Sequence, residues 1–550
     1  MDRKTLTGFI LIGAILLLWP SYIELISPSE KNPENPSLPD TTIVEKYSEQ
    51  DQEVPKKTES VKRDVESKTL TVDGGSYVAK INNIAGGSVV SFDLKKHLKS
   101  SERSLNLIDN QNSKNLVVSF INQSGEIVVL DELWSVVSGG SSVLSEENNV
   151  TSIVFETVYM GKPVTKKLTF YYNSYEIDVG VNLREIKESS LDEKYVLSWV
   201  GGLPEHEGSQ DAMFMESLVS QAGSIESFRV GAAGFFGSSN TKNIDEESKK
   251  YVGLVDFAGY RTKYFGVFFV PEKSDIVEVY KYPSTNRAGV DINISQGINL
   301  EKNKLYLGPL DYSNIEALDV GLEEKILGWQ WLSSVSWLVY SIMILLYGLI
   351  PNYGVVVVLF AVLIKLVTYP LMAKQLRSSK KMQEISPLMN NIKIKYKNNP
   401  ALQQQKMASL FQEHKINPLA GCLPLLIQMP VLMSVFMVFR NTIEFRGESF
   451  VFWINDLSAA DTLFSLGGVP INILPFLMSA SMYYTMKLSS ASQPAGGDPA
   501  QEATQQMMKY MFPGMMFFLF YSFPSGLNLY YLCFNVMQIA QQKIINNEKS

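Results

Sequence analysis

The chain has 550 residues, a formal net charge of −7 at pH 7 and only two cysteines. It has no strongly basic domain, so nucleic acid is not expected as a ligand. No GxxxxGK, HExxH, CxxC or nucleophile-elbow motif occurs and the three histidines are scattered, which argues against nucleotide hydrolysis, a catalytic metal and a hydrolase triad. Cys422 and Cys533 lie in apolar stretches and are expected to be buried free thiols. We expect no cofactor, no metal and no small-molecule substrate.

The first 26 residues predict a membrane anchor. Arg3 and Lys4 precede an apolar segment that extends to about Ile26 without a small-residue cleavage site. A retained signal-anchor over 1–26 is therefore favoured over a cleaved signal peptide, and its basic start delivers the following chain to the outside. Residues 27–68 are proline-rich, charged and poor in aromatic side chains, which predicts a flexible linker.

Short strands separated by turns follow over residues 69–318. The segments NLVVSFIN, GEIVVL, EIDVGVNLRE and KYFGVFFVP carry the β-branched and aromatic residues typical of strands. Ile177, Val179, Val181 and Leu183 alternate with polar residues, as expected for a half-buried strand. MGKP at 160–163 predicts a hairpin turn. These patterns together predict one large, exported β-sandwich domain.

Five apolar segments in the second half predict further membrane spans, and the charges between them set the topology. The loop over 374–417 holds nine Lys or Arg residues against two acidic ones, which places it in the cytoplasm. The loop over 441–468 has four acidic residues against Arg446 and belongs outside. The predicted spans are 354–373, 418–440, 469–487, 507–523 and 526–544, with a cytoplasmic loop at 488–506 and a cytoplasmic tail at 545–550.

Residues 319–353 contain one more apolar segment, at 330–350, which the topology does not allow to cross. If it crossed, the next span would return the basic loop to the outside, and only residues 351–353 separate the two segments. We therefore expect an amphipathic helix on the outer membrane surface. Trp329, Trp331 and Trp337 suit the headgroup layer.

The cytoplasmic loop over 374–417 predicts a helical hairpin. Ile385, Met389 and Ile392 recur at helical spacing, and NNP at 398–400 predicts a turn with Asn399 as the N-cap of a second helix. Its lysines form either a solvated face that obeys the positive-inside rule or a docking surface for ribosomal RNA, acidic lipid or a targeting factor. The lysines proposed for docking are Lys380, Lys381, Lys393, Lys395 and Lys397.

Lys365 interrupts the apolar run VVVVLFAVLIKLVTYPLMAKQ at 355–375. An unpaired charge at the centre of a span costs roughly 2.5 to 3.5 kcal/mol. At 1.5 Å per residue Lys365 lies about 13 Å from Lys374, too far for its stem to reach the surface. No Asp or Glu occurs in the five later spans. The pattern predicts a wetted cavity inside the bundle, with a structural lysine bonded to carbonyl groups as the alternative.

Methionines recur near this charge. Met429, Met433 and Met437 lie four residues apart in the third span, and five more methionines crowd the fifth. Flexible thioethers suit a surface that receives varied apolar partners. Ordinary core packing is the simpler explanation of the methionines taken alone, but beside a wet cationic groove they favour a path for apolar segments.

Several motifs in order resemble the YidC membrane protein insertase family, which includes mitochondrial oxidase-assembly and chloroplast Albino-type relatives. They are NPLAGCLPLLIQMPVLMSVF, FWINDLS, FPSGLNLYYLCFN and the KxxxYP of the second span, and they cover about residues 320–545. The signal-anchor and the exported β domain resemble the Gram-negative branch.

This resemblance implies a five-helix core with a hydrophilic groove that opens to cytoplasm and lipid. Lys365 takes the position of a groove cation that is usually arginine, so bidentate contacts are lost while the charge is kept. The expected groove residues are Lys365, Gln428, Tyr369, Tyr530 and Tyr531. The expected substrate-contact face of the third span is Met429, Pro430, Val431 and Met433. The β domain would be a supersandwich of the sugar-binding type, without a reason to expect sugar.

The sequence thus predicts a polytopic α-helical membrane protein with six transmembrane helices, a five-helix insertase core and a large periplasmic all-β supersandwich domain. The predicted function is insertion and chaperoning of nascent membrane proteins in the inner membrane, alone or with the Sec translocon. Further candidate partners are the ribosome and the receptor of a targeting factor. The alternatives are a solute transporter or channel, a membrane-embedded enzyme that uses Lys365, and a structural tether.

Overall fold

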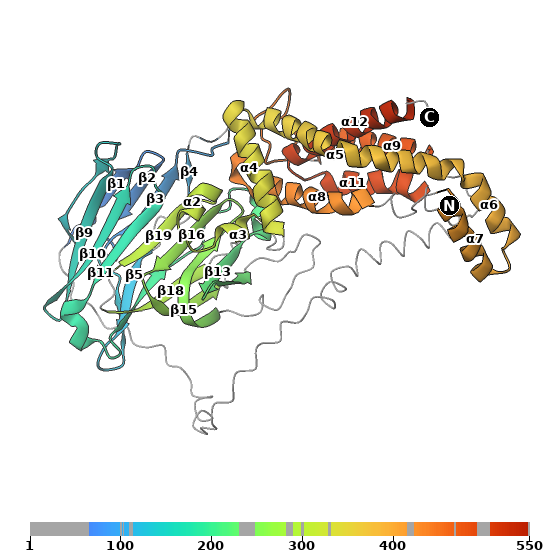
Figure 1. The fold of residues 1–550 in the computed structure, drawn as a ribbon. Helices are drawn as coiled ribbons and strands as arrows, with labels where there is room; N and C mark the ends of the chain where they lie inside the picture. Colours follow the sequence, from blue (N-terminus) through green and yellow to red (C-terminus); the bar gives the residue numbers. More distant parts are fainter. Residues whose placement is uncertain are drawn as a thin grey trace, which may run out of the picture.

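The computed structural model describes residues 65–99, 102, 104–108, 114–229, 248–281, 290–298, 302–327, 332–414, 423–466, 469–491 and 506–547. It consists of a β domain and a bundle of helices (Figure 1). The expected signal-anchor, residues 27–64 of the expected linker, and Cys422 lie outside the described residues.

The β domain contains two sheets, as far as the described residues extend. The smaller has the strand order β4-β3-β2-β1-β8, and the larger follows the path β6-β5-β12-β18-β17-β15-β16-β19-β11-β10-β9-β7, with β13 and β14 attached through β15. The smaller sheet comprises β1 (Thr69–Asp73), β2 (Tyr77–Asn82), β3 (Ser88–Leu94), β4 (Leu105–Asn106) and β8 (Ser142–Val143). The larger comprises β5 (Val117–Ile121), β6 (Ile127–Leu130), β7 (Ser135–Ser138), β9 (Val150–Tyr159), β10 (Lys162–Tyr171), β11 (Glu176–Asn182), β12 (Lys194–Trp199), β13 (Glu216–Gln221), β14 (Ser224–Arg229), β15 (Ser248–Arg261), β16 (Phe265–Pro271), β17 (Ser274–Lys281), β18 (Val290–Gly297) and β19 (Lys302–Pro309).

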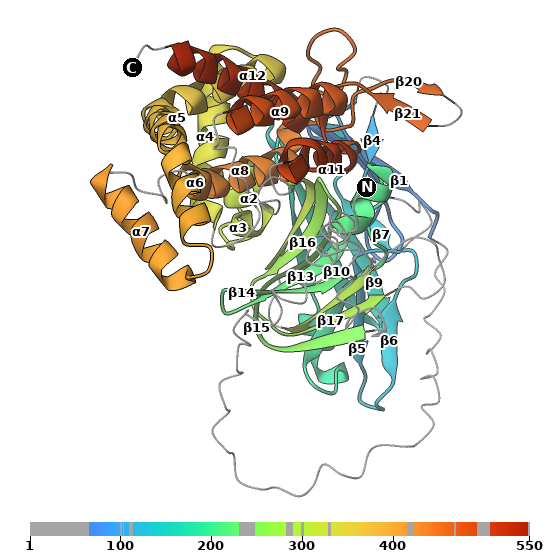
Figure 2. The same ribbon diagram turned by 90° about the vertical axis from the view of Figure 1, so that its right-hand side faces the viewer.

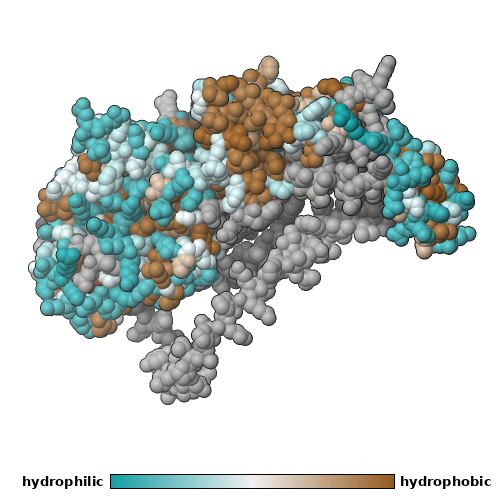
Figure 3. Space-filling view, viewed as in Figure 1, coloured by the Kyte–Doolittle hydropathy of each residue, from teal (hydrophilic) through white to brown (hydrophobic). Residues whose placement is uncertain are grey.

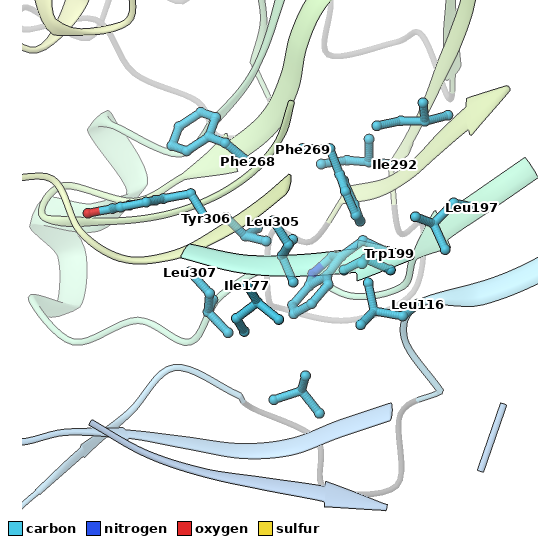
Figure 4. Close-up of a cluster of buried hydrophobic side chains, with 14 of the residues drawn as sticks. Leu116, Ile177, Leu197, Trp199, Phe268, Phe269, Ile292, Leu305, Tyr306 and Leu307 are labelled. Carbon is cyan, nitrogen blue, oxygen red and sulfur yellow. The ribbon is translucent and has the colours of Figure 1, made fainter. Parts of the chain in front are cut away.

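One hydrophobic core includes residues of both sheets. The predicted alternation is confirmed, because Ile177, Val179 and Val181 of β11 are fully buried and their neighbours in the strand are not. Ile177 pairs in register with Leu305 of β19, and both lie in the buried hydrophobic cluster that includes Trp199 (Figure 4). This packing gives a half-buried strand its stability, since each fully buried aliphatic side chain contributes roughly 1.5 to 3 kcal/mol.

The turn predicted at MGKP joins β9 to β10. Met160 and Gly161 both have positive φ, at 50° and 80°, and Tyr159 pairs with Lys162 across the turn. Two central residues of positive φ match the right-handed twist of the flanking strands. The predicted hairpin is therefore confirmed.

The helices of the second half of the chain pack side by side along much of their length. Among them, α12 contacts both α5 and α9 (Figures 1 and 2). Among the described residues, Tyr353–Ala373 is long and apolar enough to cross a membrane by itself, and Ser333–Leu349 and Met429–Asn441 are shorter apolar helices. The helices are α2 (Tyr312–Glu316), α3 (Glu323–Ile326), α4 (Ser333–Leu349), α5 (Tyr353–Glu384), α6 (Ser386–Lys395), α7 (Pro400–Glu413), α8 (Leu423–Asn441), α9 (Leu474–Ala491), α11 (Phe512–Phe520) and α12 (Ser525–Asn547), with a π-helical turn at Met507–Met511 before α11.

Two boundaries differ from the predicted spans. Helix α5 continues eleven residues beyond the predicted end at 373, to Glu384. The segment predicted as a span over 469–487 starts with strand β21 (Val469–Asn472), which pairs with β20 (Thr462–Leu466), and becomes helical at Leu474. The reason is Asp461, whose carboxylate accepts hydrogen bonds from the backbone N–H groups of Ile473 and Leu474 and so caps the start of α9.

Helix α4 crosses the other helices steeply at the end of the bundle next to the β domain (Figure 1). Its outward face is apolar, including Leu338, Leu345 and Leu349, each more than half exposed. This face forms part of the apolar patch over the middle of the molecule (Figure 3). Ser336 is instead fully buried on the inner face. Val339 and Met343 are buried on the same inner face, so α4 has apolar residues on both sides, and its position on the outer membrane surface stays a prediction.

The helical hairpin has the predicted form. Asn399 accepts a hydrogen bond from the N–H of Leu402, at 3.1 Å, and Pro400 is the first residue of α7. Ile385 and Leu410 are buried at the contact between the hairpin's helices. The N-cap and the packing face predicted from the sequence are confirmed.

A buried arginine joins the β domain to the helices. Arg446, in the loop after α8, is fully buried, and its guanidinium contacts Glu102 at 2.9 and 3.0 Å and Glu207 at 2.8 Å. Both carboxylates belong to loops of the β domain. Beside them the Cα of Gly447 lies so close to the carbonyl of Leu98 that a Cβ would sit 2.3 Å from its oxygen. The network fixes the loop after α8 against the β domain.

Candidate functional site

Lys365 lies in α5 and is fully buried against α12. Its ammonium donates a hydrogen bond to Oε1 of Gln538 and lies 3.4 Å from the ring centroid of Phe534, a cation–π contact. Gln541, one turn further along α12, donates to the backbone carbonyl of Lys365 at 3.4 Å. The charge is thus held by one amide oxygen and one aromatic face. Among the described residues, Gln538 and Phe534 cover the ammonium, and the wetted cavity expected around Lys365 stays a prediction.

A cavity of about 240 Å³ lies among α8, α9, α11 and α12. Its walls are almost wholly apolar and rich in methionine. The cavity is partly open, since Met429 in its wall is 46% exposed, and its apolar lining suits an apolar guest. The lining residues are Met429, Leu432, Met433, Phe436, Met478, Met482, Phe512, Met516, Leu519, Phe520, Phe523 and Tyr531.

The predicted substrate-contact face divides between this cavity and the bundle core. Met429 and Met433 line the cavity, and Met429 is 46% exposed. Pro430 is half-buried, and Val431 packs against the core formed by the bundle helices. Two of the four predicted residues therefore share one wall of the cavity.

The three predicted tyrosines occupy different environments. Tyr531 lines the cavity and meets Phe520 edge-on, with ring centroids 5.1 Å apart. Tyr530 is fully buried beside Phe360, and its hydroxyl has no hydrogen-bond partner among the described residues. Tyr369 is 36% exposed. The backbone of Gln428 lies in α8, but its side chain is outside the description.

The predicted docking lysines lie on the helical hairpin and the end of α5. Lys381, Lys395 and Lys397 are exposed and Lys393 is half-buried. The side chain of Lys380 is outside the description. Exposed lysines on a packed helical hairpin present a positive surface, which suits either alternative raised by the sequence.

Sequence reasoning missed the direct partners of Lys365. Gln538 and Phe534 lie 173 and 169 positions further along the chain, and no local pattern indicates which helix α5 packs against. The spacing of α12 held a usable signal: Tyr531, Phe534 and Gln538 are three and four residues apart and so share a helix face. Arg446 and Glu207 were also missed; Glu207 belongs to the EHEG loop, where a polar loop was expected.

The fold and the site define a helical membrane protein that carries a large β-sandwich and has a buried lysine and an apolar cavity within its helical bundle. Two family models match: the 60Kd inner membrane protein over residues 345–550 and the YidC periplasmic domain over residues 69–340.

Relatives match along the whole chain. The membrane protein insertase YidC of Prosthecochloris aestuarii is 32% identical, covering 100% of this chain and 95% of the relative, and that of Chlorobaculum parvum is 30% identical over 99% and 94%. The chain therefore belongs to the YidC family of membrane protein insertases, and it is an inner-membrane protein. The family predicted from the sequence is confirmed, as is its non-enzymatic function.

A crystal structure of an active YidC insertase with its first transmembrane domain resolved is 20% identical, covers 88% of this chain and 95% of its own, and has a TM-score of 0.35. A galactose mutarotase related enzyme from Lactobacillus acidophilus covers 44% of this chain and 97% of its own at 10% identity, with a TM-score of 0.27.

Proposed function

We propose that this chain inserts nascent membrane proteins by offering Lys365 to an acidic flank of the substrate and the methionine-lined cavity to its apolar segment. The observation that carries the proposal is the buried ammonium of Lys365, which has a neutral amide as its hydrogen-bonding partner. A carboxylate is a stronger hydrogen-bond acceptor for an ammonium than an amide is, so an acidic group of the substrate can replace the amide as the partner of Lys365. The contact also pairs a charge that would otherwise be costly inside the membrane.

The cavity supports the second half of this proposal. Methionine side chains adapt their shape to different guests, and the cavity is lined by methionines from three helices. An apolar segment in it exchanges water for thioether and aromatic contacts before it reaches lipid. Hydrophobic transfer drives this step without covalent chemistry.

The topology belongs to the same proposal. The helical hairpin with α6 and α7 lies in the cytoplasm, the β domain lies in the periplasm, and both termini are cytoplasmic. The acidic flank then crosses outward while the apolar segment stays in the bilayer. The Sec translocon, the ribosome and a targeting-factor receptor are proposed partners, and the exposed lysines of the hairpin are the surface offered to the last two.

The test is insertion of a single-span substrate in cells depleted of their own insertase. Two substrates are compared, one with two Asp and one with two Asn in the translocated segment. Lys365→Arg should insert both, because the charge is kept. Lys365→Met should reduce insertion of the acidic substrate by about tenfold, the equivalent of one charge-assisted hydrogen bond, and should spare the neutral one.

Each result separates the proposal from an alternative. Equal insertion of the acidic substrate by Lys365→Met and the wild type would refute a role for the charge. If Lys365→Arg were inactive with both substrates, Lys365 would act by chemistry that arginine cannot perform, as an embedded enzyme requires. Ion flux through liposomes that contain the pure protein would favour a channel instead.

A further inference from the structure

The contact between α5 and α12 holds the cation in a closed form. Lys365 is fully buried, and its ammonium is covered on one side by Gln538 and on another by the ring of Phe534. An incoming carboxylate cannot reach the ammonium while both remain in place. A substrate must therefore displace a residue of α12 before it contacts the charge.

Gln538 is suited to be displaced. Its amide oxygen is neutral, so it satisfies one donor of the ammonium without forming an ion pair. A carboxylate in the same place would make a contact about twice as strong and would compete with the substrate. The five later spans contain no Asp or Glu, so none of them offers Lys365 a stronger acceptor than this amide.

Helix α12 also connects the lysine to the cavity. Tyr531, Phe534 and Gln538 follow one another at three- and four-residue spacing and lie on one face of α12. Tyr531 lines the methionine cavity, whereas Phe534 and Gln538 contact Lys365. Seven residues of helix separate the two ends of this face, about 10 Å. A segment seated in the cavity thus lies within one or two helical turns of the covered charge.

We infer that Gln538 is a latch on Lys365: it holds the ammonium in the resting insertase, and the carboxylate of an acidic substrate segment replaces it during insertion. The latch rests on the proposed function, since it assigns Lys365 an acidic substrate. It adds a specificity-determining residue on α12. Gln538 determines how strongly an acidic group of the substrate must bind Lys365 in order to displace the Gln538 amide.

The experiment uses the full chain in proteoliposomes with the same pair of substrates, carrying two Asp or two Asn in the translocated segment. The readout is the ratio of acidic to neutral substrate inserted. Gln538→Glu supplies a permanent carboxylate of the same length, so this ratio should fall by about tenfold. Gln538→Met removes the acceptor at similar volume, so the ratio should equal or exceed that of the wild type.

Asn535→Asp provides the matched control. Asn535 is a buried amide on α12 that donates to Ser481 of α9 at 3.2 Å, so this variant adds a carboxylate to the same helix next to a different partner. Its ratio should match the wild type. An equal fall for Asn535→Asp and Gln538→Glu would overturn the latch, because any negative charge on α12 would then suffice.

Two further outcomes would also overturn it. If Gln538→Glu leaves the ratio unchanged, the amide does not compete with the substrate. If Gln538→Met lowers the ratio as far as Lys365→Met does, Gln538 is a fixed support of the lysine. A failed latch differs from a failed proposed function, because only the latter leaves the ratio of Lys365→Met at the wild-type value. Should Gln538→Glu not fold, Gln538→Met decides between latch and support.

Discussion

Lys166 is a second buried lysine, in the core of the β domain. Its ammonium donates to the backbone carbonyls of Ala85 and Leu116 and lies 5.6 Å from the ring centroid of Trp134. Burial lowers the pKa of Lys166 to about 7. In the unfolded chain a lysine titrates near 10.4. Lys166 therefore links two loops to β10, and its burial favours the neutral amine over the ammonium.

The lowered pKa of Lys166 predicts how stability depends on pH. Between about pH 7 and pH 10 the unfolded chain binds the proton that the folded domain has released, so the free energy of unfolding rises with pH in this window, by up to about 1.4 kcal/mol per unit. Urea unfolding of the β domain within the full chain, followed by tryptophan fluorescence at several pH values, measures this slope.

The control for this prediction is Lys166→Met. It leaves two buried carbonyls without their donor and lowers stability at every pH, but it also removes the titrating group. Burial lowers the pKa of Lys263 to about 8, so Lys263 contributes to the slope of both proteins. The difference between wild type and variant in the slope of unfolding free energy against pH gives the contribution of Lys166 alone. Identical slopes would show that Lys166 does not titrate in this pH window.

At the scale of single elements, the N-cap of α7 predicts the stability of the helical hairpin. Asn399→Ala removes the acceptor of the Leu402 N–H and should destabilise α7 by about 1 kcal/mol. Hydrogen exchange of the first-turn amides of α7 should accelerate by about fivefold as a result. Asn398→Ala changes the exposed neighbour and is the control. Equal exchange in the two variants would show that the cap does not hold the helix.

The elements predicted best from the sequence are those whose structure is determined by residues close together in the chain. The alternation of Ile177, Val179 and Val181 needs only the period of a strand, and the N-cap at Asn399 needs only three residues of spacing. Residues 469–472 were assigned to a span because they are apolar. Their strand depends on pairing with β20 and on the cap that Asp461 provides to α9, eight and more positions away.

The site shows the same division. The position of Lys365 and the methionine spacing follow from the chain itself, because a charge in an apolar run and a four-residue repeat are visible in one dimension. Gln538 is an ordinary polar residue near the end of a span, and its meaning comes only from the contact between α5 and α12. Contacts between distant helices are set by packing, which one sequence does not reveal.

On the scale of the whole molecule, Arg446 joins the two halves of the chain. Burial raises the pKa of Glu102, but the hydrogen bonds and the charge of Arg446 lower it by more than burial raises it. The pKa of Glu102 therefore lies below its ordinary range. The pair therefore stabilises the contact at neutral pH, and this contribution is lost as the pH falls through the lowered pKa. In the proposed topology, Arg446 fixes the periplasmic end of the bundle against the β domain.

This arrangement predicts that Arg446→Met uncouples the halves. The variant removes the guanidinium from Glu102 and Glu207, and among the described residues Lys99 still contacts them, through its ammonium at Glu207 and its backbone N–H at Glu102. Loss of one partner of a buried ion pair typically costs about 3 to 5 kcal/mol. Amide hydrogen exchange over residues 95–99 and 441–458 should then accelerate by at least about a hundredfold, while α5 and β11 keep their protection. Lys114→Met, which breaks the exposed pair with Asp131, should change exchange by less than about fivefold. If Arg446→Met exchanges like Lys114→Met, apolar packing between the β domain and the outer loop holds the halves together, and the guanidinium is dispensable.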